Sequence, residues 1–253
     1  MNLPETNLLG FISAEEQNLL VSLLKCHRDI ALAFPKLDGA YQAPIKHIEV
    51  NIKNESAWTI LALYLFTHYH LYLSTVTLLR CHLSDSLAST RKAIDATLTA
   101  YRLIAEPETL GEYKSQHRNY RFIKTYIERK RKKDPAQFPI AEPLIAVHNT
   151  CSEYGSHADI GSLMDRINIE DTERTGKGLM KVGMFQTMND TEARHHMVMT
   201  FLAFTSMLKV YQDFLGDLAQ GLDRPAWTST IDGLMVAIQK EAVQIEVNLE
   251  GAT

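Results

Sequence analysis

The hydrophobic and polar positions of the chain follow a helical pattern in most segments, and the most apolar segment runs from Ser56 to Leu79. It contains no Asp, Glu, Lys or Arg, and its apolar side chains point in every helical direction. This pattern is typical of a helix that is buried on all sides. The segment is also long enough to span a membrane, but His68, His70 and five hydroxyl side chains around them favour a helix in a protein core. We therefore predict a buried central helix over about residues 56–81 and no membrane partner.

A second helix is predicted to follow the central helix directly and to end near Ala105. Apolar spacing continues in register from Leu79 to Ile94, so a single unbroken helix is the alternative. That helix would be ~75 Å long, which exceeds the size of a compact domain of this length. We therefore predict two antiparallel helices with a tight turn near His82 and a stop at Pro107.

The remaining apolar spacing predicts further helices, and together they indicate an all-α fold, a multi-helix bundle in a single domain of residues 1–253. One helix is expected to begin at Ser13, which forms a capping box with Glu16, and to end at Pro35, so that residues 35–54 form a connection. Others are expected over about residues 108–133, 144–154 and 190–220 and from Pro225 onward. Five glycines interrupt the pattern between about residues 155 and 189, which predicts either an irregular insertion or a β-hairpin that turns near Thr175 and Gly176.

Composition narrows the class of protein without identifying a ligand. Hydrophobic residues make up 45% of the chain, as in a globular protein, and no linker-like segment divides it. The first residues lack the basic head and apolar run of a secretory signal. The three cysteines show no CxxC spacing and are expected to be free thiols, so we expect a cytoplasmic protein.

The apolar faces of two predicted helices indicate contact with a second subunit. Apolar residues of the 190–220 helix recur in alternating steps of four and three from Met197 to Leu218, and the last helix has an apolar face of its own. Such a seam packs against a neighbouring helix at a shallow angle. We expect one of these two faces to lie on another subunit, which predicts a homodimer.

Positive charge is concentrated between Lys114 and Lys133. This segment holds nine lysines and arginines and a single acid, Glu128, whereas the whole chain has a net charge of −4. Tyr120, Phe122 and Tyr126 are interleaved with the cations, as in segments that follow a phosphate backbone. The alternative is a solvated helix whose terminal cations favour its own dipole. The candidate nucleic-acid-binding residues are Lys114, Arg118, Arg121, Arg129 and Arg131.

No sequence motif predicts catalysis, a cofactor or a metal. The chain has no G-x-S-x-G elbow, no G-x-G-x-x-G and no Walker loop. Glu192-x-x-His195 matches half of a di-iron bundle motif, but such sites need a second pair and two further glutamates. His68 and His70 point to different sides of their helix and are predicted to be core histidines with hydrogen-bond partners.

Arg91, Asp95 and His157 form a second candidate site. Arg91 and Asp95 lie one helical turn apart among apolar positions, so that an ion pair between them is expected to be partly buried. His157 opens the irregular segment. If that segment folds over the 86–105 helix, His157 reaches the pair and closes a small polar site.

The segment LSDSLASTRKAIDATLTAYRLIAEPE resembles the helix of a large group of uncharacterised bacterial all-helical proteins. In that group an A-x-x-x-x-R-x-x-x-E-type helix follows an apolar helix and a turn, and a segment with a single His, an irregular or hairpin stretch and a long apolar helix come later. Here these parts are Arg91 to Asp95, residues 154–157, residues 158–189 and residues 190–220, so the resemblance covers about residues 56–220. Asp95 stands where Glu is usual.

The group is loosely similar to helical ribonucleases and phage-defence domains of the HEPN type. Those carry an Arg followed four to six residues later by His, and no Arg of this chain has such a His. Two hypotheses follow. The first is a ligand-sensing or interaction domain without catalysis, for an unknown small molecule. The second is a nucleic-acid-acting protein, such as an atypical ribonuclease or phage-defence component, that uses the basic helix 114–133.

Overall fold

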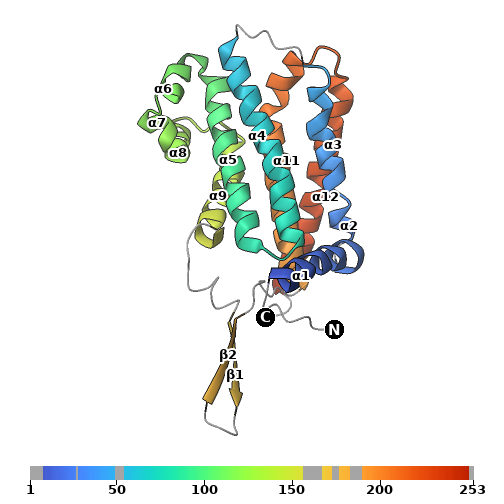
Figure 1. Ribbon diagram of the computed structural model, residues 1–253. Coiled ribbons are helices and arrows are strands. Elements are labelled where there is room, and N and C mark those ends of the chain that lie inside the picture. Colours follow the sequence, from blue (N-terminus) through green and yellow to red (C-terminus); the bar gives the residue numbers. More distant parts are fainter. Residues whose placement is uncertain are drawn as a thin grey trace.

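The computed structural model describes residues 8–26, 28–48, 54–155, 167–172, 177–182 and 190–250, and most of these are α-helical. The long helices of the bundle lie side by side (Figure 1). They are α3 (Phe34–Ile45), α4 (Glu55–Leu79), α5 (Leu83–Ala105), α11 (Asp190–Leu218) and α12 (Arg224–Glu250). The shorter α9 (Ala141–Gly155) packs against α5. The predicted all-α multi-helix bundle is confirmed.

Helices α4 and α5 form the predicted antiparallel pair. Asn54 caps α4, because its side-chain oxygen accepts a hydrogen bond from the Ala57 amide at 3.1 Å. The chain reverses at Cys81, whose φ of 66° lies in the left-handed region that side-chain-bearing residues rarely adopt. One residue in that conformation is enough to end α4 and to start α5 at Leu83.

Short hydroxyl side chains line the contact between α4 and α5. The Ser74 and Thr90 hydroxyl oxygens lie 2.7 Å apart, and those of Thr67 and Thr97 lie 3.2 Å apart. Small residues let the two helices approach closely, and these four hydroxyls are satisfied across the contact, which avoids the cost of unpaired polar groups. The pairing explains why the apolar segment tolerates Thr67 and Ser74 on its buried side.

Burial of α4 is one-sided, although the sequence pattern predicts burial on all sides. Ile60, Tyr64 and Leu71 are buried, whereas Leu65 and Tyr69 are 42% and 55% exposed. Helices α5 and α11 occupy the interior instead, and the predicted seam of α11 is buried from Met197 to Leu215, with Phe204, Leu208, Tyr211 and Leu215 fully inaccessible. The α11 seam therefore packs within the chain and is not available to a second subunit, while the homodimer itself stays a prediction.

The N-terminal region differs from the prediction. Helix α1 (Leu8–Val21) begins before Ser13, which lies inside it and accepts a hydrogen bond from the Gln17 side chain at 3.4 Å. Pro35 does not end a helix. It stands in the first turn of α3, where the missing N–H of proline is not needed. Residues 34–45 are therefore helical rather than a connection, and α2 (Arg28–Ala31) precedes them.

Buried hydrogen bonds join α3 to the two C-terminal helices. The Tyr41 hydroxyl donates to the Phe204 carbonyl at 2.7 Å, and the Trp227 indole N–H donates to the Ala40 carbonyl at 2.8 Å. Helix α12 begins as predicted, with the Asp223 side chain accepting a hydrogen bond from the Ala226 amide at 3.1 Å.

Two paired strands lie beyond the end of the helices (Figure 1). Strands β1 (Ile167–Thr172) and β2 (Lys177–Val182) are antiparallel, with Ile167 opposite Val182 and Thr172 opposite Lys177. Of the two alternatives for the insertion, this pairing agrees with the hairpin. None of the described helices combines the length and apolar character that a membrane crossing requires.

Candidate functional site

The basic segment is not one helix, as the sequence predicts, but a series of short ones. A 3₁₀ turn (Pro107–Thr109) leads into α6 (Leu110–Lys114), α7 (Arg118–Arg121) and α8 (Ile123–Lys133). Between α6 and α7, Gln116 has a positive φ of 52°, and the His117 ring nitrogen accepts a hydrogen bond from the Asn119 amide at 3.3 Å. Phe122 separates α7 from α8 with a non-helical backbone. The predicted continuous basic helix is therefore broken at these two points.

A buried arginine on α5 holds these short helices in place. The Arg102 side chain is 2% exposed and donates to Glu106 at 3.0 Å and to Glu112 of α6 at 2.9 Å. Its guanidinium also lies between two rings, 4.3 Å from the centre of Tyr120 in α7 and 3.9 Å from that of Tyr126 in α8. Arg102 thus contacts all three helices that follow it and fixes their positions on the bundle.

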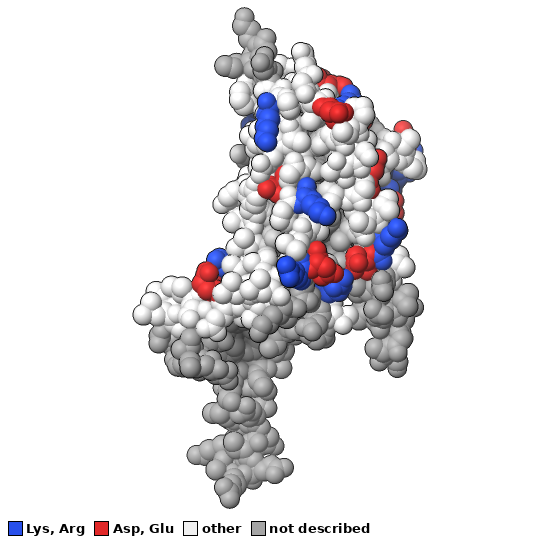
Figure 2. Space-filling view, turned by 90° about the vertical axis from the view of Figure 1, so that its right-hand side faces the viewer, with Lys and Arg blue, Asp and Glu red and all other residues white. Residues whose placement is uncertain are grey.

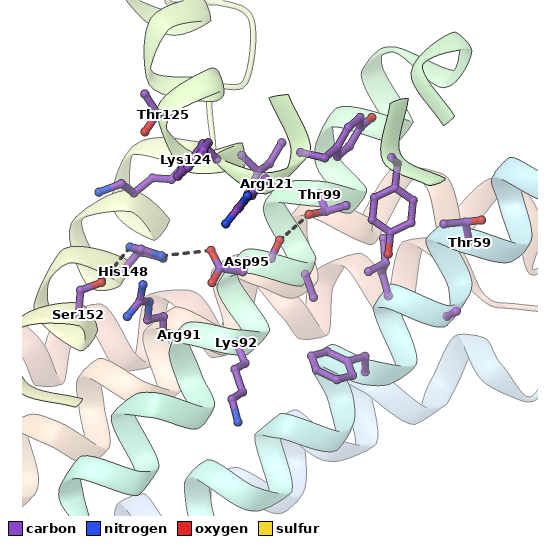
Figure 3. Close-up of a pocket in the computed structure, with 18 residues that line it drawn as sticks. Thr59, Arg91, Lys92, Asp95, Thr99, Arg121, Lys124, Thr125, His148 and Ser152 are labelled. Atoms are coloured by element: carbon purple, nitrogen blue, oxygen red, sulfur yellow. Dashed lines mark hydrogen bonds and ion pairs between the residues drawn. The ribbon is translucent and has the colours of Figure 1, made fainter. Parts of the chain in front are cut away.

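A cleft of about 900 Å³ lies between these short helices and the bundle. Helix α5 forms one wall with Arg91, Asp95 and Thr99, and α9 closes the end with His148 and Ser152 (Figure 3). Helix α4 supplies Thr59, Ala62 and Phe66, and the α7–α8 junction supplies the wall opposite α5. A cleft of this volume can hold a ligand of the size of a nucleotide.

Asp95, His148 and Ser152 are connected at one end of the cleft (Figure 3). The His148 imidazole is buried and lies 3.1 Å from an Asp95 oxygen through Nε2, so that Nε2–H donates to the carboxylate. The other ring nitrogen, Nδ1, lies 3.3 Å from the Ser152 hydroxyl oxygen, and the single proton of that hydroxyl is donated to the His148 carbonyl at 2.7 Å. The carboxylate and the hydroxyl therefore fix the orientation of the imidazole.

The predicted polar site is placed only in part. Arg91 and Asp95 both line the cleft, but the ion pair expected between them is absent from the described part of the chain, because the Asp95 carboxylate faces His148. His157 lies outside the described residues. The histidine that meets Asp95 is His148, which comes from α9.

Cations outnumber acids around the cleft. Arg91, Lys92, Arg121 and Lys124 line it, and Asp95 is the one carboxylate among its described lining residues. Arg121 points from α7 toward Asp95 in Figure 3, whereas Lys92 points away from it. Lys124 donates to the neutral side chain of Asn149 at 2.7 Å. None of these four cations has a carboxylate partner within the described ranges, so the cleft has an uncompensated positive potential.

A second cleft of about 440 Å³ adjoins the first and contains Arg118 and Arg129. The two clefts share Phe122 and Thr125. The Phe122 ring is 53% exposed, and the Arg118 and Arg121 guanidinium groups lie 5.9 and 5.8 Å from its centre. An exposed aromatic ring between two arginines offers a stacking surface beside bound phosphate.

The predicted nucleic-acid-binding residues fall into two groups. Arg118, Arg121 and Arg129 line the clefts and have no acidic partner among the residues that the structure describes. Lys114 is paired with Glu55, and Arg131 is paired with Glu142 at 2.6 Å. Arg118, Arg121 and Arg129 are therefore available to bind a ligand. Lys114 and Arg131 instead form ion pairs that hold the short helices against the bundle.

The other polar residues singled out by sequence have ordinary structural partners. His68 lies 2.7 Å from an Asp38 oxygen, and His70 lies 2.7 Å from the Ser89 hydroxyl, which confirms two core histidines with separate partners. Within the described ranges, no three His, Cys, Asp or Glu side chains are grouped closely enough to hold a metal ion.

Cys151 is a buried residue of α9, three positions after His148, and gives a direct test of how tightly this end of the cleft is packed. Burial raises the pKa of the Cys151 thiol to about 12, although the charge of Arg91 acts in the opposite direction. Because the thiolate is the reactive form, we expect Cys151 to resist alkylation by iodoacetamide at pH 8 in the folded protein and to react after unfolding in urea. Peptide mass spectrometry measures both states, and rapid labelling in the folded protein would show that α9 is loosely held.

Two residues of the site, Arg102 and His148, are not found by motif. Arg102 lies one turn after Leu98 on the apolar face of α5, and His148 lies one turn after Leu144 on the apolar face of α9. A single polar residue in an apolar register is the available signal for both. Phe122 is one of the aromatic residues interleaved with the cations in the sequence, but its exposure depends on the break between α7 and α8. No family model, no curated protein and no solved structure matches the chain.

Proposed function

We propose that the chain binds single-stranded nucleic acid across the two adjoining clefts of α7 and α8. The observation that supports this most strongly is the arrangement of cations around Phe122. Six cations that lack acidic partners in the described part of the chain line the two clefts, namely Arg91, Lys92, Arg118, Arg121, Lys124 and Arg129. The clefts share the exposed Phe122 ring. A ligand that carries several phosphates and an unpaired base fits this pattern.

Unpaired cations in a concave surface favour an anionic ligand for electrostatic reasons. The cations repel one another, and this repulsion is relieved when phosphate groups replace the water and counterions beside them. The Asp95 carboxylate is held by His148 at 3.1 Å, so it neutralises only part of this charge. Cations of the same segment that are paired with Glu55 or Glu142 contribute less, since their charge is already compensated.

The shape of the site favours a strand over a duplex. Phe122 stands between the clefts, where a base from a flexible strand can stack on its ring while the neighbouring phosphates reach Arg118 and Arg121. A duplex keeps its bases stacked on one another and does not offer a free base face. Longer oligonucleotides are expected to bind more tightly than short ones until both clefts are filled.

A ligand-sensing role remains the second candidate, and the volume of the larger cleft supports it. About 900 Å³ is within the usual range for a small-molecule site. On this alternative the ligand is a mononucleotide or another phosphorylated aromatic molecule, and the second cleft stays empty. Competition between a mononucleotide and an oligonucleotide separates the two roles.

The experiment measures binding of fluorescent single-stranded DNA and RNA oligonucleotides by anisotropy across a salt series. We expect R121Q and K124Q each to weaken binding about tenfold at low salt. Each should also reduce the slope of log affinity against log salt by about 0.7, the value for one phosphate contact on a single strand. F122A should weaken binding with little change in slope, because stacking is not an ionic interaction.

K209Q is the matched control, since it removes one positive charge from a lysine paired with Asp232 on the C-terminal helices. If K209Q and R121Q weakened oligonucleotide binding equally, the loss of affinity would come from the change in net charge alone. That result would contradict the proposed location of the binding site. No binding of any oligonucleotide at 20 mM salt would contradict the proposal as a whole. Displacement by equimolar adenosine monophosphate would favour the mononucleotide.

A further inference from the structure

The outer face of α4 presents an apolar stripe to solvent along the whole helix. Six large side chains on this face are between 37% and 55% exposed, namely Trp58, Leu65, Tyr69, Tyr72, Leu73 and Val76. Trp58, Leu65, Tyr69, Tyr72 and Val76 follow one another at steps of seven, four, three and four, the spacing of a helix that packs along its length against another helix. No charged side chain interrupts the face between residues 56 and 79.

Helix α1 adds a second apolar surface near the C-terminal end of α4. It has no buried residue, and Leu8, Leu9 and Leu20 are 72%, 78% and 55% exposed. In Figure 2 it is the mostly uncharged arm that projects from the lower part of the bundle. Glu15 and Glu16 tie it to His82 and Arg80 at 2.8 and 2.9 Å. A helix of 14 residues is marginal without packing, so the exposed side of α1 lacks the contacts that stabilise helices of this length.

The combined surface is larger than an isolated monomer normally exposes. At roughly 150–250 Å² for each large side chain, the exposed fractions of the α4 stripe amount to roughly 500 Å² and those of α1 to a similar area. The largest apolar patch of a typical monomer covers about 300–600 Å². A stable protein interface buries about 800 Å² on each partner, which the two helices together supply.

We infer that a second copy of this chain covers the α4 stripe in a two-fold dimer. In a two-fold interface the same patch meets itself, so it must be complementary to itself. An uncharged stripe with helix-packing spacing meets this requirement, because no like charges face each other when α4 lies against the partner subunit's α4. With the two α4 helices antiparallel, α1 of each subunit lies beside the N-terminal half of the partner's α4.

The charges around the stripe argue against a lipid surface as the occupant. Helices that lie on membranes carry lysines and arginines along the polar flanks of the apolar face. The ends of α4 carry Glu55 and Arg80, and both are engaged, with Lys114 and Glu16 respectively. Helix α4 itself therefore supplies no basic border of the kind that anionic lipids attract.

The dimer also places the partner beside the cleft. Phe66 is 44% exposed on the same side of α4 and lines the larger cleft, so it adjoins both surfaces. The second copy thus borders the cleft at its α4 wall. The interface itself rests on α1 and α4 and does not depend on the nature of the ligand.

Sedimentation velocity from 1 to 100 µM tests the inference on the full chain. We expect a species of twice the 28.6 kDa chain mass. The double variant L65E/Y69E should shift the dissociation constant upward at least 100-fold and leave a single-chain species, because two pairs of like charges meet at the two-fold axis. V236E is the matched control, since Val236 is 52% exposed on α12, away from the stripe. The dissociation constant of the V236E dimer should equal that of the wild type.

Helix content from circular dichroism confirms that each variant folds. A wild-type chain that stays at single-chain mass up to 100 µM overturns the inference, and so does a monomeric chain that co-sediments with phosphatidylserine vesicles. A dimer that persists in L65E/Y69E overturns it as well, because the interface would then lie elsewhere.

Discussion

Replacement of Arg102 by alanine is expected to lower the free energy of unfolding by about 3–5 kcal/mol, the cost of removing one partner from a buried ion pair. The guanidinium is almost fully buried and is the shared partner of Glu106 and Glu112. Without it, Glu106, whose side chain is 13% exposed, keeps a buried negative charge with Lys130 and the Tyr126 hydroxyl as its remaining partners. The Tyr120 and Tyr126 rings also lose the cation between them. Urea unfolding followed by circular dichroism measures the loss.

Two further variants separate the role of Arg102 from that of charge alone. R131A removes an arginine paired with the largely exposed Glu142, and we expect it to cost less than about 1 kcal/mol. R102K keeps the charge but loses the planar fork that reaches two carboxylates and stacks on two rings, so its cost should lie between the two. A loss below 1 kcal/mol in R102A would show that α6, α7 and α8 hold their positions without it.

R102A should also weaken oligonucleotide binding, although Arg102 does not line the proposed binding site. Arg102 does not line either cleft, but it contacts the helices that carry Arg118, Arg121 and Lys124. If these helices shift, the cations no longer face one ligand together. We therefore expect oligonucleotide affinity to fall in R102A but to be retained in R131A.

The sequence was sufficient to predict helices whose formation depends on local pattern. The uncharged stretch from residue 56 to 79 predicted α4, and the short polar interruption at His82 predicted the reversal into α5. The seam from Met197 to Leu218 predicted α11 with its buried face. In each case apolar spacing and the end signals indicate the same element.

The sequence pattern gave a wrong prediction where one residue type can occur in two structural positions. Pro35 can end a helix or occupy its first turn, and only the packing of Phe34, Leu37 and Tyr41 against the bundle shows that α3 begins there. The full burial predicted for α4 failed for a related reason. An apolar face looks the same in the sequence whether the chain itself or a second molecule covers it.

The candidate site required contacts between distant parts of the chain. Arg91 and Asp95 both line the larger cleft, but which histidine meets Asp95 depends on how α9 lies against α5. The basic helix was predicted as continuous because helix propensity runs through residues 108–133. Its breaks at Gln116 and Phe122 are stabilised by Arg102, which belongs to another helix. Tertiary contacts of this kind override local helix propensity.

Acid is expected to destabilise the protein, and the pH range follows from the buried and hydrogen-bonded carboxylates. Burial alone would raise the pKa of Glu106, but hydrogen bonds from Arg102, Tyr126 and Lys130 hold that pKa below its ordinary value of 4.5. The pKa of Asp38 is also lowered from 3.8, because hydrogen bonds from Tyr72, His68 and Gln42 outweigh its burial. A carboxyl group whose pKa is depressed in the folded state stabilises that state fully above its unfolded pKa and loses this contribution as the pH falls through its folded pKa.

The free energy of unfolding should therefore remain nearly level with respect to these groups down to about pH 5 and fall steadily below about pH 4.5, where the unfolded chain takes up protons that the folded chain does not. Urea titrations at pH 7, 5, 4 and 3 measure this curve, and E106Q isolates the contribution of one group. Glutamine cannot ionise and accepts fewer charge-assisted hydrogen bonds from Arg102 and Lys130, so E106Q should be less stable than the wild type at pH 7. At pH 3 the wild-type carboxyl group is partly protonated and loses part of its stabilising effect, so the difference in unfolding free energy between the two proteins should shrink.

A difference in unfolding free energy that stays constant from pH 7 to pH 3 would mean that the Arg102–Glu106 pair does not contribute through its charge. The stabilising role assigned to Arg102 would then rest on its packing between Tyr120 and Tyr126.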